Sequence, residues 1–254
     1  MNRIKPYLII VLVLIVWTVG SFLGLFNTYL IPPPWRVAWT AWGLVLNGVL
    51  IRHMATSFSR VIIGFAITVC FAFPMGLLVG LHKTSRDFWE APLNFIRHIP
   101  PLATVPMLIL WFGIGEPAKL VIIILSAFFP VFLNTVSGVA NCDQKLIEVG
   151  KALGYKSSDR LLHIILPAAI PSILVGFQLG IGYSWRALVG AELLAAASGL
   201  GYMIIEAEQL SRPDVVVVGI ITIGFLGLLI DIVFDYFCRR LMPWRKEEKI
   251  YVQG

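Results

Sequence analysis

Several long stretches of this chain carry no charged side chain, and they limit the folds that are open to it. Tyr7–Phe26 and Val61–Leu81 both lack Asp, Glu, Lys and Arg, and a helix needs about 20 apolar residues to cross a bilayer. Hydrophobic residues make up 58% of the chain and charged residues only 13%, whereas soluble domains carry about 25% charged residues. The sequence therefore predicts an all-α polytopic membrane protein.

The apolar runs divide into six predicted transmembrane helices within a single domain, residues 1–254. The first run is longer than the apolar core of a signal peptide, so we interpret it as a retained span. Prolines interrupt the third run, and its helix is expected to begin near Leu102. The segment SGLGYMI after the fifth span is expected to be re-entrant or interfacial. The predicted spans are residues 7–26, 61–81, 102–115, 120–140, 171–197 and 215–237.

The basic residues are distributed unevenly between the two sides of this topology. Six spans place both chain ends on one side, and that side carries 14 of the 20 Lys and Arg residues. Cytoplasmic loops are enriched in Lys and Arg, so both termini and the segment 141–167 are predicted to be cytoplasmic. The same rule accounts for the net charge of +6, and no nucleic-acid partner is expected.

Three smaller features complete the topology. The segment IPPPWRVAWTAWGLVLNG is either an interfacial helix at the outer surface, with tryptophans at near-helical spacing, or a plain loop with an aromatic belt. Arg60, at the outer end of the second span, is expected to snorkel and to have no role in substrate binding. The three cysteines, Cys70, Cys142 and Cys238, are isolated in the sequence and fit neither a metal site nor a disulfide framework.

A charged segment, Glu148–Pro167, separates two apolar spans on the predicted cytoplasmic side. Apolar residues before and within it recur at helical spacing, namely Leu146, Val149 and Leu153. Gly154 is suited to end this helix, Ser157 or Ser158 to cap a second one, and Pro167 to introduce the next bend. The two short helices either contact a cytosolic partner or fold back on their own protein.

The spacing within this segment resembles a known motif. Glu148, Gly154 and the run Ile164-x-Leu166-Pro167 are similar to the E-A-A-x3-G-x9-I-x-L-P motif of ABC importer permeases, with Val149 and Gly150 replacing the two alanines. LIPPPWRV, HMATSFSRVIIGF, RHIPPLATVPMLILWFGIGEPAK and AELLAAASGLGYMI resemble the nitrate/sulfonate/taurine branch, although His98 and Thr104 depart from it. The resemblance implies that the ATPase-coupling residues are Glu148, Gly150, Ala152, Leu153, Gly154, Leu166 and Pro167.

The resemblance also implies a type I ABC importer permease fold and a set of partners. Two permease copies would assemble with two cytosolic ABC ATPase subunits in the bacterial inner membrane, and an extracytoplasmic binding protein would deliver the substrate. This chain has no G-x-x-x-x-G-K-[ST] phosphate-binding loop. We therefore expect no cofactor in this chain, no enzymatic activity of its own, and ATP hydrolysis by the partner subunit.

Two charged residues fall inside the fifth predicted span. Arg186 and Glu192 are six positions apart and do not share a helix face. Glu192 lies in a segment similar to the family pattern A-A-E-[LM] and is either a pathway or dimer-interface carboxylate or a structural anchor. Arg186 is either a pathway cation suited to an oxyanion or a structural arginine. The candidate pathway residues are Gln178, Trp185, Arg186 and Glu192, with core packing as the alternative for Trp185.

Three classes of function remain open on the sequence alone. The first is the permease subunit of an ATP-driven importer for a small anion such as an organosulfonate, taurine or nitrate, with a pyrimidine vitamin precursor or aromatic acid as alternative cargo. The second is a self-sufficient secondary transporter or channel, although no internal repeat supports it. The third is a membrane enzyme, but the four histidines show no metal-ligand grouping.

Overall fold

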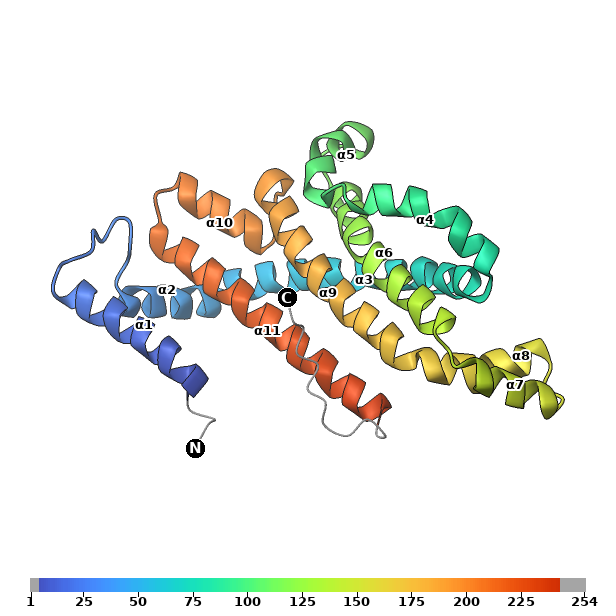
Figure 1. Ribbon diagram of the computed structural model, residues 1–254. Helices are drawn as coiled ribbons and strands as arrows, with labels where there is room; N and C mark the ends of the chain where they lie inside the picture. Colours follow the sequence, from blue (N-terminus) through green and yellow to red (C-terminus); the bar gives the residue numbers. More distant parts are fainter. Residues whose placement is uncertain (1–4, 243–254) are drawn as a thin grey trace. The chain divides into compact units, whose positions relative to one another are not determined.

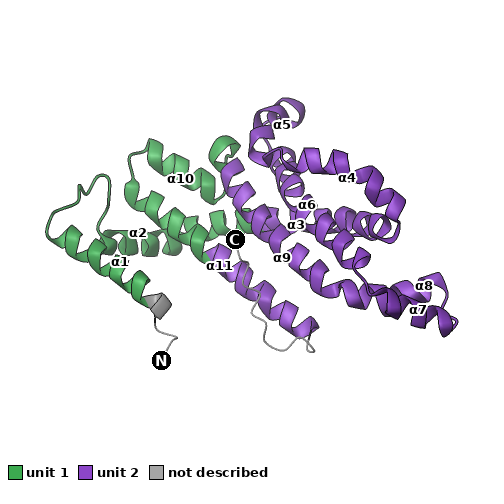
Figure 2. Ribbon diagram, viewed as in Figure 1, with its two compact units in different colours: residues 1–58, 192–225 green, residues 59–191, 226–254 purple. Residues whose placement is uncertain are grey.

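A computed structural model describes residues 5–242 of the chain, with side chains from Leu8 onward. Between these limits the ordered elements are all helical, as predicted, and no strand occurs. The chain forms two compact units, residues 1–58 with 192–225 and residues 59–191 with 226–254 (Figure 2). The chain ends on which the predicted cytoplasmic termini fall, residues 1–4 and 243–254, lie outside the described residues.

The first unit is built from short helices and from the ends of three long ones (Figure 1). The indole N–H of Trp17 donates to the Pro32 carbonyl at 3.1 Å, and the Thr40 hydroxyl donates to the Asp214 carboxylate at 2.8 Å. The helices that contribute are α1 (Lys5–Phe22), α2 (Pro34–Leu46), α3 (Val49–Leu81), α9 (Leu166–Ala195), α10 (Leu200–Gln209) and α11 (Pro213–Leu241).

Helix α2 resolves one alternative left by the sequence. It begins directly at Pro34, whose fixed φ suits the first turn of a helix. The segment after the prolines is therefore a helix and not a plain loop. Trp35, Trp39 and Trp42 are all exposed on it, and their placement at a membrane surface stays a prediction.

The second unit contains the remaining helices and several buried apolar clusters. One cluster joins α5, α6 and α9 through Val105, Ile122 and Ala191, and another joins α6 and α9 through Val139 and Ile173. The helices that lie wholly in this unit are α4 (Lys83–Arg97), η1 (Pro101–Thr104), α5 (Val105–Phe112), α6 (Glu116–Ala140), α7 (Gln144–Ala152), α8 (Ser157–Arg160) and the π turn η2 (Leu161–Ile165).

Glycines of the segment GFQLG in α9 bring α9 and α6 close together. A Cβ at Gly176 would lie 2.6 Å from the Cβ of Asn134 and 2.8 Å from the Pro130 carbonyl oxygen, and one at Gly180 would lie 2.9 Å from Val131. Small residues allow this backbone approach where packing, rather than the hydrophobic effect, holds membrane helices together.

Four described helical segments are long and apolar enough to cross a membrane: Val49–Leu81, Glu116–Ala140, the stretch Ser157–Gln209 that runs from α8 through α10, and Pro213–Leu241. A fifth crossing exists if Lys83–Arg97 and Pro101–Phe112, which meet at 74°, form one broken span. The first predicted span is also a helix, but its apolar part, Leu8–Phe22, is shorter than the four segments above.

The third predicted helix, 102–115, is shorter than expected. It starts as the 3₁₀ turn η1, and α5 ends at Phe112, because Gly113 adopts a left-handed φ of 76° and caps the helix. An α-helix of this length rises only about 12 Å, which is less than the hydrocarbon core of about 30 Å.

The expectation for Arg60 is wrong, and the bend at Pro167 stays a prediction. Pro167 lies in the first turn of α9, and the π turn η2 directly before this helix leads from α8 into α9 without an interruption of the helix. Arg60 does not snorkel. Helix α3 begins at Val49, so Arg60 lies inside it, only 4% exposed, and its guanidinium donates to the Glu116 carboxylate at 2.6 Å.

Candidate functional site

The segment between α6 and α9 forms a compact elbow, which we define as residues 141–167 (Figure 1). The carboxylate of Asp143 caps α7 by accepting the backbone N–H of Lys145 at 2.9 Å. Gly154 ends the corner with a left-handed φ of 76°, as predicted. The serine cap predicted for the second helix is wrong. Lys156 is the N-cap residue, and Asp159 accepts its backbone N–H at 3.3 Å.

Helix α7 buries one face and exposes an apolar stripe on another. Gly150 is buried, and a Cβ there would overlap the Ile164 side chain of η2. The stripe consists of Leu146, Val149 and Leu153, which are 48%, 55% and 67% exposed. Because these residues do not pack onto the elbow itself, its fold leaves an apolar surface accessible to another molecule.

The other predicted coupling residues are distributed over both faces of the elbow. Glu148, Ala152 and Pro167 are exposed, and Leu166 is half-buried at the start of α9. Cys142 is buried beside α7, and burial together with the neighbouring Asp143 charge raises the pKa of its thiol. This thiol is therefore protonated and unreactive at neutral pH.

Glu192 lies in a buried hydrogen-bond network of the first unit and is 1% exposed. Its carboxylate accepts the Ser57 hydroxyl at 2.9 Å and the Gly201 N–H at 3.0 Å, while the Ser57 oxygen accepts the Leu200 N–H. A carboxylate at this position satisfies the first N–H groups of α10 and complements the helix dipole. Gly199 has a φ of 112°, and a Cβ there would overlap the Glu192 carboxylate.

The three other candidate pathway residues differ in their surroundings. Trp185 is buried, with its indole packed against Gly227 of α11, as core packing requires. Gln178 is half-buried on α9. Arg186 is exposed, and its guanidinium lies 5.6 Å from the centre of the Tyr183 ring, beside a cavity that both residues line.

Sequence reasoning missed the partners of the buried charges. Ser57 contacts a carboxylate 135 positions away, and Arg60 contacts one 56 positions away. No local periodicity signals such pairs. An ionisable residue inside an apolar helix is itself the available signal, because it needs a partner. Among residues 8–242, no three His, Cys, Asp or Glu side chains gather as metal ligands would.

Comparisons with known proteins agree with this architecture. Residues 72–243 match the family described as binding-protein-dependent transport system inner membrane component. The aliphatic sulfonates transport permease SsuC of Bacillus subtilis is 37% identical over 241 residues, covering 95% of this chain and 87% of that protein. The taurine transport system permease TauC of Escherichia coli is 35% identical, covering 93% and 88%. The nitrate import permease NrtB of Leptolyngbya laminosa is 29% identical, covering 83% and 78%.

A solved structure of the MetNI methionine ABC transporter in an inward facing conformation has the same fold. It superimposes with a TM-score of 0.67 at 17% identity, covering 77% of this chain and 97% of that one. The family match and these relatives exclude an enzyme and agree with a multi-pass inner-membrane subunit. This chain belongs to the family of binding-protein-dependent transport system inner membrane components and is the permease subunit of an ABC importer.

Proposed function

We propose that the chain imports a small anion by coupling its elbow to a cytosolic ATPase. Two copies of the permease assemble with two ATPase subunits, which hydrolyse the ATP, and an extracytoplasmic binding protein delivers the substrate. The chain crosses the membrane six times, with both termini and the elbow, residues 141–167, in the cytosol.

The exposed apolar stripe of α7 carries this proposal. Leu146, Val149 and Leu153 lie on a helix that is held in place by the burial of Gly150. A preformed helix with an apolar face fits a complementary groove, and its few anchors recur at i, i+3 and i+7. The ATPase supplies that groove, so closure of the ATPase dimer moves the elbow. Glu148, Ala152, Gly154, Leu166 and Pro167 shape or border the contact.

The names of the relatives support the choice of cargo. The relatives named for aliphatic sulfonates, taurine and nitrate each align with more than four-fifths of this chain. All three substrates are small and oxygen-rich, and the sulfonates among them bear an organic group. We propose that the substrate comes from this group, and that Arg186 faces it in the pathway.

Leu153→Asp is expected to weaken association with the ATPase about tenfold or more, because burial of the leucine is worth about 1.5–3 kcal/mol and a buried aspartate would add a desolvation cost. The measurement is co-purification of the tagged permease with its ATPase, together with substrate-stimulated ATP hydrolysis. Glu148→Arg tests the polar border of the same surface.

Gln144→Asp is the matched control for this experiment. It places the same charge on an exposed position at the start of α7, away from the apolar stripe. An aspartate also suits the first turn of a helix, so association should be unchanged. Equal co-purification of Leu153→Asp, Gln144→Asp and the wild type would refute docking through the stripe.

A further inference from the structure

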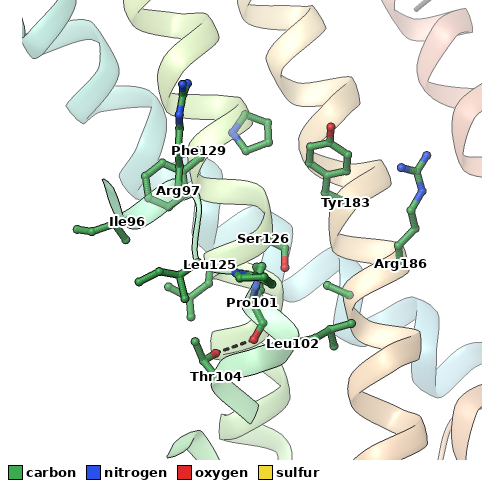
Figure 3. Close-up of a pocket in the computed structure, with 14 residues that line it drawn as sticks. Ile96, Arg97, Pro101, Leu102, Thr104, Leu125, Ser126, Phe129, Tyr183 and Arg186 are labelled. Carbon is green, nitrogen blue, oxygen red and sulfur yellow. Dashed lines mark hydrogen bonds between the residues drawn. The ribbon is translucent and has the colours of Figure 1, made fainter. Parts of the chain in front are cut away.

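A cavity of about 430 Å³ opens in the second unit between the end of α4, η1, α6 and α9 (Figure 3). Small-molecule sites are typically about 300–1,000 Å³, so its size suits a compact organic ligand. Apolar side chains supply much of its lining, including Leu102 from η1 and Leu125 and Phe129 from α6. These walls favour an apolar group on the ligand.

The polar groups of the cavity divide into occupied and available donors. The Ser126 hydroxyl donates to the Ile122 carbonyl at 2.8 Å, and the Thr104 hydroxyl donates to the Pro101 carbonyl at 2.6 Å. The available donors belong to Arg97, Tyr183 and Arg186. Arg97 comes from the end of α4 on one wall and Arg186 from α9 on the other (Figure 3).

The guanidinium groups are not neutralised by the part of the chain that the structure describes. No described carboxylate lies within 4.0 Å of Arg97 or Arg186, and the Arg186 guanidinium instead lies 5.6 Å from the centre of the Tyr183 ring. A cation within an apolar span is costly unless an anion neutralises it. A guanidinium binds planar or tetrahedral oxyanions through paired hydrogen bonds.

We propose that this cavity is a substrate subsite of the permease itself, selective for an organic anion with an apolar body over a bare inorganic anion. Arg186 binds the anionic group, Tyr183 orients the guanidinium, and Leu125 and Phe129 contact the apolar body. The inference rests on the proposed import of an anion and deepens it, because the permease then adds selectivity to that of the binding protein. Organosulfonates fit this cavity better than nitrate.

The test compares two sulfonates that differ only in their tails. Binding of 1-hexanesulfonate and methanesulfonate to the purified permease–ATPase complex is measured by titration calorimetry in nanodiscs, without the binding protein. Each methylene that leaves water tightens binding about fourfold, so hexanesulfonate should bind at least about tenfold more tightly. Equal affinities for the two would overturn the proposal.

Three variants separate the roles of the charge and the walls. Arg186→Gln should weaken the binding of both sulfonates about tenfold or more, since a hydrogen bond to a charged group is lost. Arg186→Lys should bind them with an affinity between that of the wild type and that of Arg186→Gln. Phe129→Ala should reduce the preference for hexanesulfonate and leave methanesulfonate affinity unchanged. Arg240→Gln, at an exposed position in the last turn of α11, is the control for loss of an arginine. Unchanged binding in Arg186→Gln would overturn the subsite.

A phospholipid headgroup offers the same chemistry, an anion on an apolar body. Nanodiscs with and without phosphatidylglycerol distinguish the two sources. Competition by this lipid that disappears in Arg186→Gln would assign the cavity to lipid and overturn the substrate role. Each variant is first checked for co-purification with the ATPase. Failed sulfonate binding with intact ATPase association refutes the subsite alone, whereas lost association in the elbow variants refutes the proposed coupling.

Discussion

Glu192→Ala is expected to lower the free energy of unfolding by about 2–5 kcal/mol. The substitution leaves the Ser57 hydroxyl and the Gly201 N–H buried without the carboxylate that they contact, and each orphaned group costs about 1–3 kcal/mol. In a protein of this size, 1 kcal/mol shifts the melting temperature by about 2–4 °C, so a decrease of roughly 4–20 °C should be seen in a thermal melt of the purified complex.

Two further variants serve as controls for this experiment. Glu192→Gln keeps the volume and one carbonyl acceptor, so it should lose less than half as much stability. Glu208→Ala removes an exposed glutamate from α10, the helix whose first turn the Glu192 carboxylate contacts, and should be nearly neutral. If Glu192→Ala melted like the wild type but abolished uptake, Glu192 would be a pathway carboxylate, and the structural role inferred from the network would be wrong.

Glu116→Ala is expected to cost about 2–4 kcal/mol, more than Arg60→Met does. The carboxylate of Glu116 is 57% exposed, but its partners Arg60 and Lys119 are each 4% exposed. Removing the carboxylate leaves the buried cations without this anion. An ion pair loses most stability when the charge that remains is the buried one, because that charge is then neither paired nor solvated. Removing Arg60 replaces a buried cation with an apolar side chain and leaves Glu116 in contact with solvent and with Lys119.

The same melting experiment on both variants tests the order of these costs. Arg239→Met breaks an exposed ion pair with Asp235 on one face of α11, and exposed pairs contribute about 0–1 kcal/mol. This control should therefore hardly change the melting temperature. A larger loss in Arg60→Met than in Glu116→Ala would contradict the assignment of Glu116 as the anion that stabilises two buried cations.

The sequence predicted those features that depend on local composition. The apolar runs predicted α6 and α11, and both helices begin and end within a few residues of the predicted bounds. The glycine corner at Gly154 was predicted because only a few residues tolerate its left-handed φ. The two short helices of the elbow were predicted from its charged, helix-forming composition.

The features that were missed depend on contacts between residues far apart in the sequence, or on a local change of helix type. Arg60 was expected at a helix end because Val61 begins an uncharged run, yet the helix extends twelve residues earlier, from Val49, and a carboxylate on α6 pairs with it. The π turn shortly before Pro167 was not predicted either, because no residue type in that segment signals it. The contacts of Glu192 were also missed, because Ser57 and Gly201, which donate to its carboxylate, lie on other helices.

The central claim is that the elbow projects into the cytosol, where an ATPase can bind it. Lys151→Cys and Lys156→Cys place single thiols on exposed elbow positions. A Cys70→Ser background removes the exposed native thiol, while Cys142 and Cys238 are buried. A membrane-impermeant maleimide should label both positions in inverted membrane vesicles and neither in intact spheroplasts. Labelling of intact spheroplasts would place the elbow outside the cell and contradict coupling to a cytosolic ATPase.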